Sequence, residues 1–161
     1  MKIEWKDCDY ETTLILNNWL QKNEEISKFA IFDETFTDEL NYYKNNKNIF
    51  PGEISNFVKV VYIDNKLIAY VVLNYGLYEN KRELSINPIV INPEETNKGF
   101  AKIIIKDLIA NYRNFVKDLD LITVSIDKKN TLSVKLFNSL KFDISGTSED
   151  NLFDYYQYLV K

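Results

Sequence analysis

Histidine is absent from the 161-residue sequence, and cysteine occurs once, as Cys8. Without histidine the chain can form neither a Ser-His-Asp or Cys-His catalytic centre nor a zinc site with histidine ligands. One cysteine also excludes a four-cysteine zinc site and an internal disulfide bond, which is typical of a reducing, cytoplasmic location. We therefore expect no metal, and any general base must be a carboxylate, a tyrosine, a lysine, the thiol or a bound water molecule.

Glycine and proline are also scarce, with 4 and 3 occurrences. No linker rich in these residues, internal repeat or low-complexity block divides the chain, so we predict a single domain over residues 1–161. A Rossmann dinucleotide site needs more glycines than Gly99 supplies at its helix start, and the Gly-Lys-Ser/Thr of a Walker loop is absent.

An excess of positive charge is missing as well, since the formal net charge is -4. A broad basic surface for nucleic acid is therefore disfavoured, whereas a cationic amine substrate is compatible with this balance. No apolar run approaches the ~20 residues of a membrane-spanning helix. Charges throughout residues 1–7 leave no apolar core for a signal peptide. We expect a cytoplasmic protein that binds neither nucleic acid nor membranes.

What is present is a succession of strand-like and helix-like segments in the order β-α-α-β-β-β-α-β-α-β-β. Strands are predicted at residues 3–5, 56–63, 67–75, 83–91, 120–126, 141–145 and 152–160. Helices are predicted at residues 11–22, 37–45, 98–113 and 131–140, the last behind an Asn130 cap. Residues 56–75 read as a hairpin with its turn at residues 64–66.

The most informative stretch runs from Ile86 to Lys106. Pro88 cannot donate to a β ladder, so it indicates an edge, a bulge or a locally splayed strand. After Pro93 a polar turn leads to a helix that opens around Gly99, with lysines on one face. Free amides and the positive end of the helix dipole make such a first turn an anion site, typically for phosphate.

Two local patterns resemble those of the GNAT family of N-acetyltransferases. Ile89-Val90-Ile91-Asn92-Pro93, followed by Thr96-Asn97-Lys98-Gly99-Phe100-Ala101, is similar to that family's (Gln/Arg)-x-x-Gly-x-(Gly/Ala) pyrophosphate loop. Asn130-x-x-Ser133-x-x-Leu136-Phe137-x-x-x-x-Phe142 is similar to its asparagine-containing helix beside the cofactor arm. The element order matches over essentially the full length. The resemblance implies an α+β fold in α/β/α layers, with a mixed, mostly antiparallel, twisted sheet of about seven strands and four helices.

The resemblance also implies acetyl-CoA as cosubstrate and transfer of its acetyl group to a primary amine on a small molecule or a protein. The positions implied for CoA binding are Ile89, Val90, Ile91, Thr96, Asn97, Lys98, Gly99, Phe100, Ala101, Lys102, Asn130 and Phe137. The amides from Lys98 to Lys102 would cradle the pyrophosphate, and the strand edge from Ile89 to Ile91 would pair with the pantetheine arm. A splay just after Pro88 would free an N–H near Ile89 or Val90 for the thioester oxygen.

The resemblance indicates the catalytic and acceptor-binding residues less directly than the CoA-binding ones. Some members of the family carry a glutamate at the position of Ser85, and Glu83 shares its face by the two-residue period of a strand. We expect Glu83 to act as the base through a water molecule. Asp33 and Glu34, between the first two predicted helices, correspond to the family's acceptor-binding wall. Homodimers are common in the family, so a homodimer is compatible with this sequence.

Three positions depart from the family pattern. Thr96 replaces the usual Gln or Arg, and Phe137 replaces a tyrosine that often serves as general acid. Lys141 replaces the glycine that commonly ends the last helix, and a left-handed lysine there would be strained by about 1 kcal/mol. Two alternatives stay open: a catalytically weak or inactive acyl-CoA-binding sensor of the same fold, and an unrelated α+β interaction domain. Asn130 as a simple cap and Glu83 as a surface residue are equally compatible with the sequence.

Overall fold

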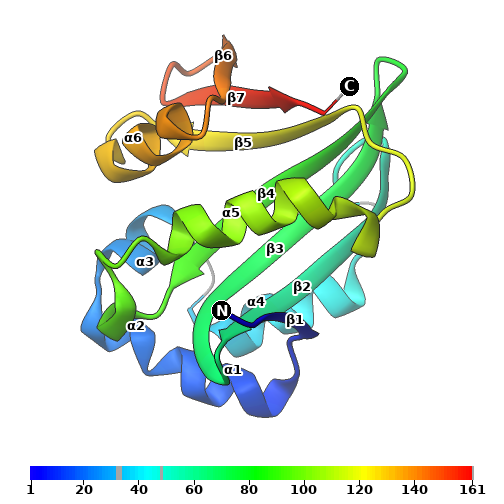
Figure 1. Ribbon diagram of the computed structural model, residues 1–161. Helices are drawn as coiled ribbons and strands as arrows, with labels where there is room; N and C mark the ends of the chain where they lie inside the picture. The colour runs from blue at the N-terminus through cyan, green and yellow to red at the C-terminus, as the bar shows by residue number, and fades with distance from the viewer. Residues whose placement is uncertain (32–33, 48, 161) are drawn as a thin grey trace.

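The computed structural model describes residues 1–31, 34–47 and 49–160, and a single mixed sheet forms its centre (Figure 1). The strand order is β1-β2-β3-β4-β5-β7-β6. Within the described chain, β4 and β5 are parallel and the other neighbouring pairs are antiparallel. The predicted seven-stranded, mostly antiparallel sheet is therefore confirmed. Its strands are β1 (Ile3–Asp7), β2 (Glu53–Ile63), β3 (Lys66–Tyr78), β4 (Lys81–Ile91), β5 (Leu121–Asp127), β6 (Asp143–Thr147) and β7 (Phe153–Leu159).

Helices cover both faces of the sheet, as the predicted layers require. The α-helices are α1 (Tyr10–Asn17), α2 (Trp19–Lys22), α3 (Glu25–Phe29), α4 (Phe36–Asn45), α5 (Phe100–Asn111) and α6 (Thr131–Ser139), and two 3-10 turns are η1 (Pro93–Glu95) and η2 (Tyr112–Asn114). In the described ranges, no helix is both long and apolar enough to cross a membrane.

The predicted helix over residues 11–22 is wrong in detail, because α1 and α2 divide it at Asn18 and α3 follows separately. Asparagine favours helix ends, since its short amide competes for nearby backbone groups. The side chain of Asn17 makes a tertiary contact as well, because its Oδ1 accepts from the N–H of Phe36 at the start of α4 (2.8 Å). The helix predicted from Lys98 begins instead at Phe100, after a left-handed Gly99 (φ 81°).

Two apolar cores lie on opposite faces of β3, which is buried on both sides. Val71 and Leu73 contact the core beneath α5 and α6, whereas Tyr70 and Val72 contact the core beneath α1 to α4. Successive side chains of a strand point to opposite faces of the sheet, so neighbouring residues of β3 pack into different cores. Phe36 of α4 stacks edge-on against Tyr70, with ring centroids 4.9 Å apart.

A bulge in β4 changes which face its side chains occupy. Leu73 pairs with Ile86 and Val71 pairs with Ile89, so Asn87 and Pro88 both lie opposite a single residue of β3. As a result Ile86 and Ile89, three positions apart, both pack into the core beneath α5 and α6. The bulge that Pro88 indicates in the sequence is thus present.

Strands β4 and β5 part at this bulge. Their parallel pairing runs from Glu83 with Leu121 to Ile86 with Val124. Beyond that point β4 continues along β3 and β5 continues along β7, and the two strands diverge in Figure 1. The splay predicted just after Pro88 therefore begins earlier, directly after Ile86, because the bulge includes Asn87.

A left-handed lysine ends α6. Lys141 has φ 66°, as the missing family glycine led us to consider. The N–H of Phe142 donates to Phe137 O and that of Lys141 donates to Asn138 O, both at 3.0 Å, which is a Schellman motif. The rings of Phe137 and Phe142 meet edge-on at 5.0 Å and supply the apolar contact that accompanies this motif. Packing and hydrogen bonds thus hold a conformation that the lysine side chain disfavours.

Replacing this lysine should stabilise the protein. We expect Lys141→Gly to raise the free energy of unfolding by about 0.5–1 kcal/mol, because glycine adopts positive φ without a steric penalty. Lys141→Ala is the matched control, since it removes the side chain but keeps a Cβ in the left-handed region. Urea unfolding of the three proteins checks this, and equal gains for both variants would contradict the conformational explanation.

Candidate functional site

Two pockets meet where β4 and β5 part. The larger pocket has a volume of about 600 Å³ and the smaller one about 140 Å³. They share the residues at the point of divergence, which are Ile86, Asn87, Val124 and Ser125. A group that enters from one pocket can therefore reach a group that enters from the other.

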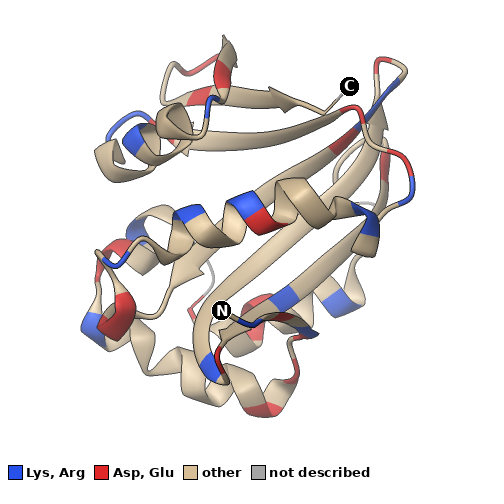
Figure 2. Cartoon of the chain, viewed as in Figure 1, with Lys and Arg blue, Asp and Glu red and all other residues tan. Residues whose placement is uncertain are grey.

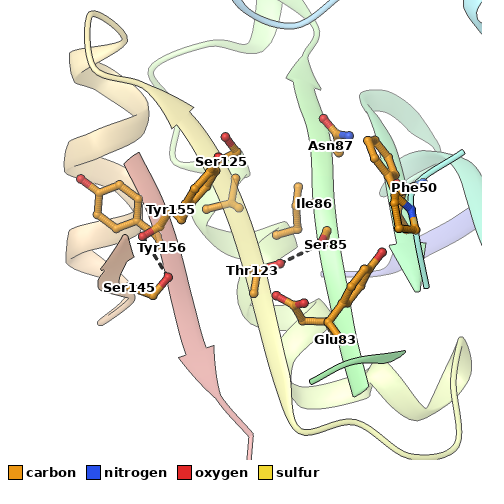
Figure 3. Close-up of a pocket in the computed structure, with 14 residues that line it drawn as sticks. Phe50, Glu83, Ser85, Ile86, Asn87, Thr123, Ser125, Ser145, Tyr155 and Tyr156 are labelled. Carbon is orange, nitrogen blue, oxygen red and sulfur yellow. Dashed lines mark hydrogen bonds between the residues drawn. The ribbon is translucent and has the colours of Figure 1, made fainter. Parts of the chain in front are cut away.

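The larger pocket combines one carboxylate with hydroxyl, amide and aromatic groups (Figure 3). Glu83 is the one charged side chain in its described lining. Its polar residues are Asn74, Ser85, Asn87, Thr123, Ser125 and Ser145, and its aromatic residues are Phe50, Tyr78, Tyr155 and Tyr156.

Glu83 lies beside a pair of hydroxyl groups that joins β4 to β5. Ser85 lies opposite Thr123, and their hydroxyl oxygens are 2.7 Å apart, within hydrogen-bonding distance. Either hydroxyl can be the donor of this bond. The Thr123 hydroxyl also favours the ionised form of the Glu83 carboxylate. Ser85 and Thr123 therefore place hydroxyl groups next to Glu83.

The pKa of Glu83 lies above its ordinary value. Partial burial is the main cause, since desolvation disfavours the charged carboxylate. The neighbouring Thr123 hydroxyl opposes this rise in the pKa, and the nearby charge of Glu79 adds to it. A carboxylate shifted in this direction is a better proton acceptor near neutral pH than an ordinary surface glutamate.

Asn74 extends the polar row to β3, where it pairs with Ser85. It is 3% exposed, and its Nδ2 donates to Oε1 of Glu53 (3.1 Å), while Oε2 of Glu53 accepts from the N–H of Phe50 (3.2 Å). In the described chain the Asn74 Oδ1 has no hydrogen-bond partner. The sequence analysis did not single out Asn74, although one polar residue inside a long apolar strand is the signal that marks it.

The smaller pocket exposes an unpaired edge of β4. The N–H of Asn92 donates to Ile68 O (2.7 Å), so it points toward β3. Ladder directions alternate along an antiparallel strand, so we infer that the N–H of Val90 also points toward β3 and those of Ile89 and Ile91 point toward the splay. Ile89 lines the smaller pocket, whereas Val90 packs its side chain into the core beneath α1 to α4.

The loop before α5 presents backbone amides at the end of the same opening. Asn97 (φ 63°) and Gly99 (φ 81°) are left-handed, and the first intrahelical bond runs from Ile103 N–H to Gly99 O. The amides from Phe100 to Lys102 precede that bond and face outward from the helix end. A Cβ on Gly99 would meet no atom within 4 Å, so the space beside this turn is open.

Charges around the loop are already partly paired. Glu95 binds both Lys66 and Lys98, the latter at 2.9 Å, and these lysines hold the pKa of Glu95 below its usual range, Lys66 contributing most. Lys102 and Lys106 of α5 line a groove against the end of α6. Basic segments lie along α5 in Figure 2. Thr96 donates its hydroxyl to Pro93 O (3.2 Å), so its side chain is used within the turn.

Helix α6 and its cap contribute Asn130, Ser133 and Phe137 to the smaller pocket. Asn130 caps the helix, with its Oδ1 accepting from Ser133 N–H (3.3 Å), so its Nδ2 is the group it can offer a ligand. Phe137 is 1% exposed and packs edge-on against Phe142. The ring carries no hydroxyl, so it supplies packing and no proton.

The acceptor residues named from the sequence lie elsewhere or cannot be placed. Glu34 is exposed in the bend before α4, and neither pocket at the splay has it in the described lining. Asp33 lies outside the described residues. Thr123, Phe50, Tyr78 and Tyr155 were missed, because their assembly depends on strand register and loop position rather than on a local pattern.

These features fit an acyl-CoA site: a free strand edge, a helix start rich in amides and a narrow pocket that opens onto a wider one. Among the described residues, no group of three His, Cys, Asp or Glu side chains could hold a metal ion. The arrangement suits a protein that binds an extended, phosphorylated ligand across a splayed sheet.

Comparisons with known proteins identify the family of this chain. The family described as "Acetyltransferase (GNAT) family" matches residues 13–142, so the chain belongs to the GNAT acetyltransferases, whose cosubstrate is acetyl-CoA. Among curated proteins no match was found.

Solved structures share the fold. A Vibrio cholerae spermidine N-acetyltransferase, crystallised with CoA and spermine, is 20% identical with a TM-score of 0.74, covering 98% of this chain and 95% of that one. An aminoglycoside N(6')-acetyltransferase from Legionella pneumophila is 11% identical with a TM-score of 0.73, covering 99% and 94%. A GNAT-family acetyltransferase from Streptococcus pneumoniae is 15% identical with a TM-score of 0.65, covering 99% and 100%.

The raised pKa of Glu83 has a consequence for stability. Since burial makes the ionised carboxylate unfavourable in the folded state, we expect Glu83→Gln to be more stable than the parent protein at pH 7. The advantage should shrink as the pH falls below the ordinary glutamate pKa of ~4.3, where Glu83 is neutral in both folded and unfolded chains. Urea unfolding at pH 7 and near pH 4 measures it. A variant less stable than the parent at pH 7 would show that Glu83 is structural.

Proposed function

We propose that this chain is an N-acetyltransferase that transfers the acetyl group of acetyl-CoA to a primary amine. The observation that carries the proposal is the parting of β4 and β5 after Ile86, which joins a pocket holding Glu83 to a narrow pocket with a free strand edge. Such a junction brings two ligands together without a covalent enzyme intermediate.

Residues on three elements would hold the cosubstrate. The amides from Phe100 to Lys102, at the positive end of the α5 dipole, suit the pyrophosphate. The outward N–H groups of Ile89 and Ile91 suit the amide carbonyls of the pantetheine arm, and the Asn130 Nδ2 adds a donor from the opposite side. When bound, acetyl-CoA supplies the acetyl group as a thioester.

The N–H of Ile89 is the donor closest in the chain to the bulge, where the two pockets meet. A backbone N–H is fixed by its strand, so it needs no reorganisation to meet a developing negative charge. Donors of this kind contribute roughly 3 kcal/mol in comparable oxyanion sites.

The acceptor amine must arrive neutral. An alkylamine with a pKa of ~10.4 is almost fully protonated at pH 7, which costs about 4.6 kcal/mol. Glu83, acting through a water molecule, accepts one proton of the ammonium. The amine nitrogen then bonds to the acetyl carbon as the carbon–sulfur bond breaks, and a second amine proton leaves with the sulfur as the thiol.

Phe137 favours a second candidate, an acyl-CoA-binding protein without turnover, because this buried ring provides no general acid. A thiol pKa near ~8.5 still makes the thiolate a tolerable leaving group. We therefore expect catalysis slower by about 10²-fold than with a tyrosine acid, but not its absence. Whether the protein forms a homodimer stays a prediction.

Calorimetry with acetyl-CoA tests the site directly. We expect micromolar binding by the parent protein and at least tenfold weaker binding by Gly99→Glu than by Gly99→Gln, a factor equivalent to about 1.4 kcal/mol. Both variants carry the same strain at a positive φ and nearly the same volume, so the difference isolates the charge beside the pyrophosphate.

Thiol release with a set of amines then separates the two candidates. Binding with amine-dependent thiol release supports the acetyltransferase, and binding without it supports the sensor. Failure of the folded parent protein to bind acetyl-CoA would contradict both.

A further inference from the structure

Given the proposed acetyltransferase function, we infer that the larger pocket selects a small primary amine with one positive charge, an apolar ring-bearing body and no anionic group. The inference rests on the charges, the unpartnered acceptor and the aromatic walls of this pocket. It concerns the acceptor and leaves the CoA site unchanged.

The pocket has one place for positive charge. Glu83 is the one ionisable acid in its described lining. Two other carboxylates lie nearby, and neither lines the pocket in the described chain. Glu53 already accepts from Asn74 and from the N–H of Phe50. Glu79, whose charge acts on Glu83, is exposed in the turn before β4. An acceptor with several ammonium groups would leave the additional charges without carboxylate partners, which is unfavourable in a partly buried site.

Cations are missing from the same lining, among the residues that the structure describes. Arg82 neighbours Glu83 in sequence but projects to the opposite face, where its guanidinium donates to the Tyr75 hydroxyl (3.3 Å). An acceptor with a carboxylate would place that anion near Glu83 with no basic side chain to balance it. Like charges at this distance disfavour binding, so the pocket discriminates against amino acids.

A buried oxygen of Asn74 in the pocket lining suits an N–H donor on the ligand. Because the carboxylate of Glu53 can only accept, Asn74 must turn its Nδ2 toward Glu53, which fixes Oδ1 as the free group. This Oδ1 is buried and unpartnered, and Asn74 lies on the same sheet face as its paired residue Ser85. A buried acceptor without a donor is costly, so a donor that reaches it gains more than an exposed contact would.

Aromatic rings form the remaining walls. Phe50 and Tyr155 are 40% and 43% exposed, so their faces are available to a ligand. Tyr78 lies over two glycines, since a Cβ on Gly76 would come within 2.8 Å of both Gly52 O and the Tyr78 hydroxyl. The three rings suit an apolar, flat body beside the ammonium. A volume of about 600 Å³ is typical of small-molecule sites.

Two matched amine pairs test the inference, by thiol-release kinetics and by calorimetric binding to the CoA-loaded protein. Phenylalanine adds a carboxylate to 2-phenylethylamine, and 1,4-diaminobutane adds a second charge to butylamine. We expect kcat/KM and affinity to fall about tenfold or more with each addition, and 2-phenylethylamine to exceed butylamine. Tyr155→Ala, a change at an exposed side chain, should narrow the ratio between 2-phenylethylamine and butylamine.

The outcomes distinguish this inference from the proposed function. Preference for 1,4-diaminobutane, spermidine or phenylalanine would overturn the inference and leave the acetyltransferase intact. An unchanged ratio in Tyr155→Ala would overturn the ring-binding role of this wall. If acetyl-CoA binds but no amine binds or reacts, both the inference and the proposed function fail.

Discussion

The fold depends on one constraint: β4 must pair with β5 for a few residues and then leave it. Pairing from Glu83 to Ile86 fixes the register that brings Ser85 opposite Thr123. Beyond it, the bulge at Asn87 and Pro88 shifts the side-chain alternation by one residue, so that Ile89 and Ile91 pack beneath α5 as Ile86 does. We infer that the amides of Ile89 and Ile91 face the opening. If β4 and β5 paired along their whole length, the junction between the two pockets would be closed. If they did not pair at all, nothing would fix the position of Glu83 beside that junction. Partial pairing therefore creates the site and keeps its walls rigid.

The polar groups that suit the site for binding lower the stability of the fold. The row from Asn74 through Ser85 to Thr123 introduces polar groups into a sheet whose buried positions are mostly apolar, with Glu53 of β2 as a further charged residue among those the structure describes. It includes an acceptor oxygen without a partner and a glutamate that burial destabilises in its charged form. Such groups are costly in a core, and their concentration at one junction is typical of a binding site. The strained left-handed backbone of Lys141 is a different case from the groups at the site, because the hydrogen bonds of the Schellman motif at the end of α6 account for it.

The sequence predicted the sheet because its strands carry strong alternating patterns, and Pro88 indicated the bulge because its missing N–H is a local property. Asn130 was predicted as a cap for the same reason. The division of the first helix was missed, since Asn17 acts through tertiary hydrogen bonds to Phe36 and Thr37 as well as through propensity. The meeting of Thr123 and Asn74 with Ser85 could not be predicted, because it depends on the register of separate strands. Phe50 comes to the pocket from a loop whose path no periodicity describes.

The central claim is that CoA binds along the edge of β4 that the splay leaves free. Amide hydrogen exchange, followed by NMR with and without acetyl-CoA, tests this residue by residue. The account predicts that the ligand slows exchange at Ile89 and Ile91, whose N–H groups face the opening, while Val90, already bonded toward β3, changes little. Tight binding with no added protection at Ile89 and Ile91 would contradict it and place the ligand elsewhere on the molecule.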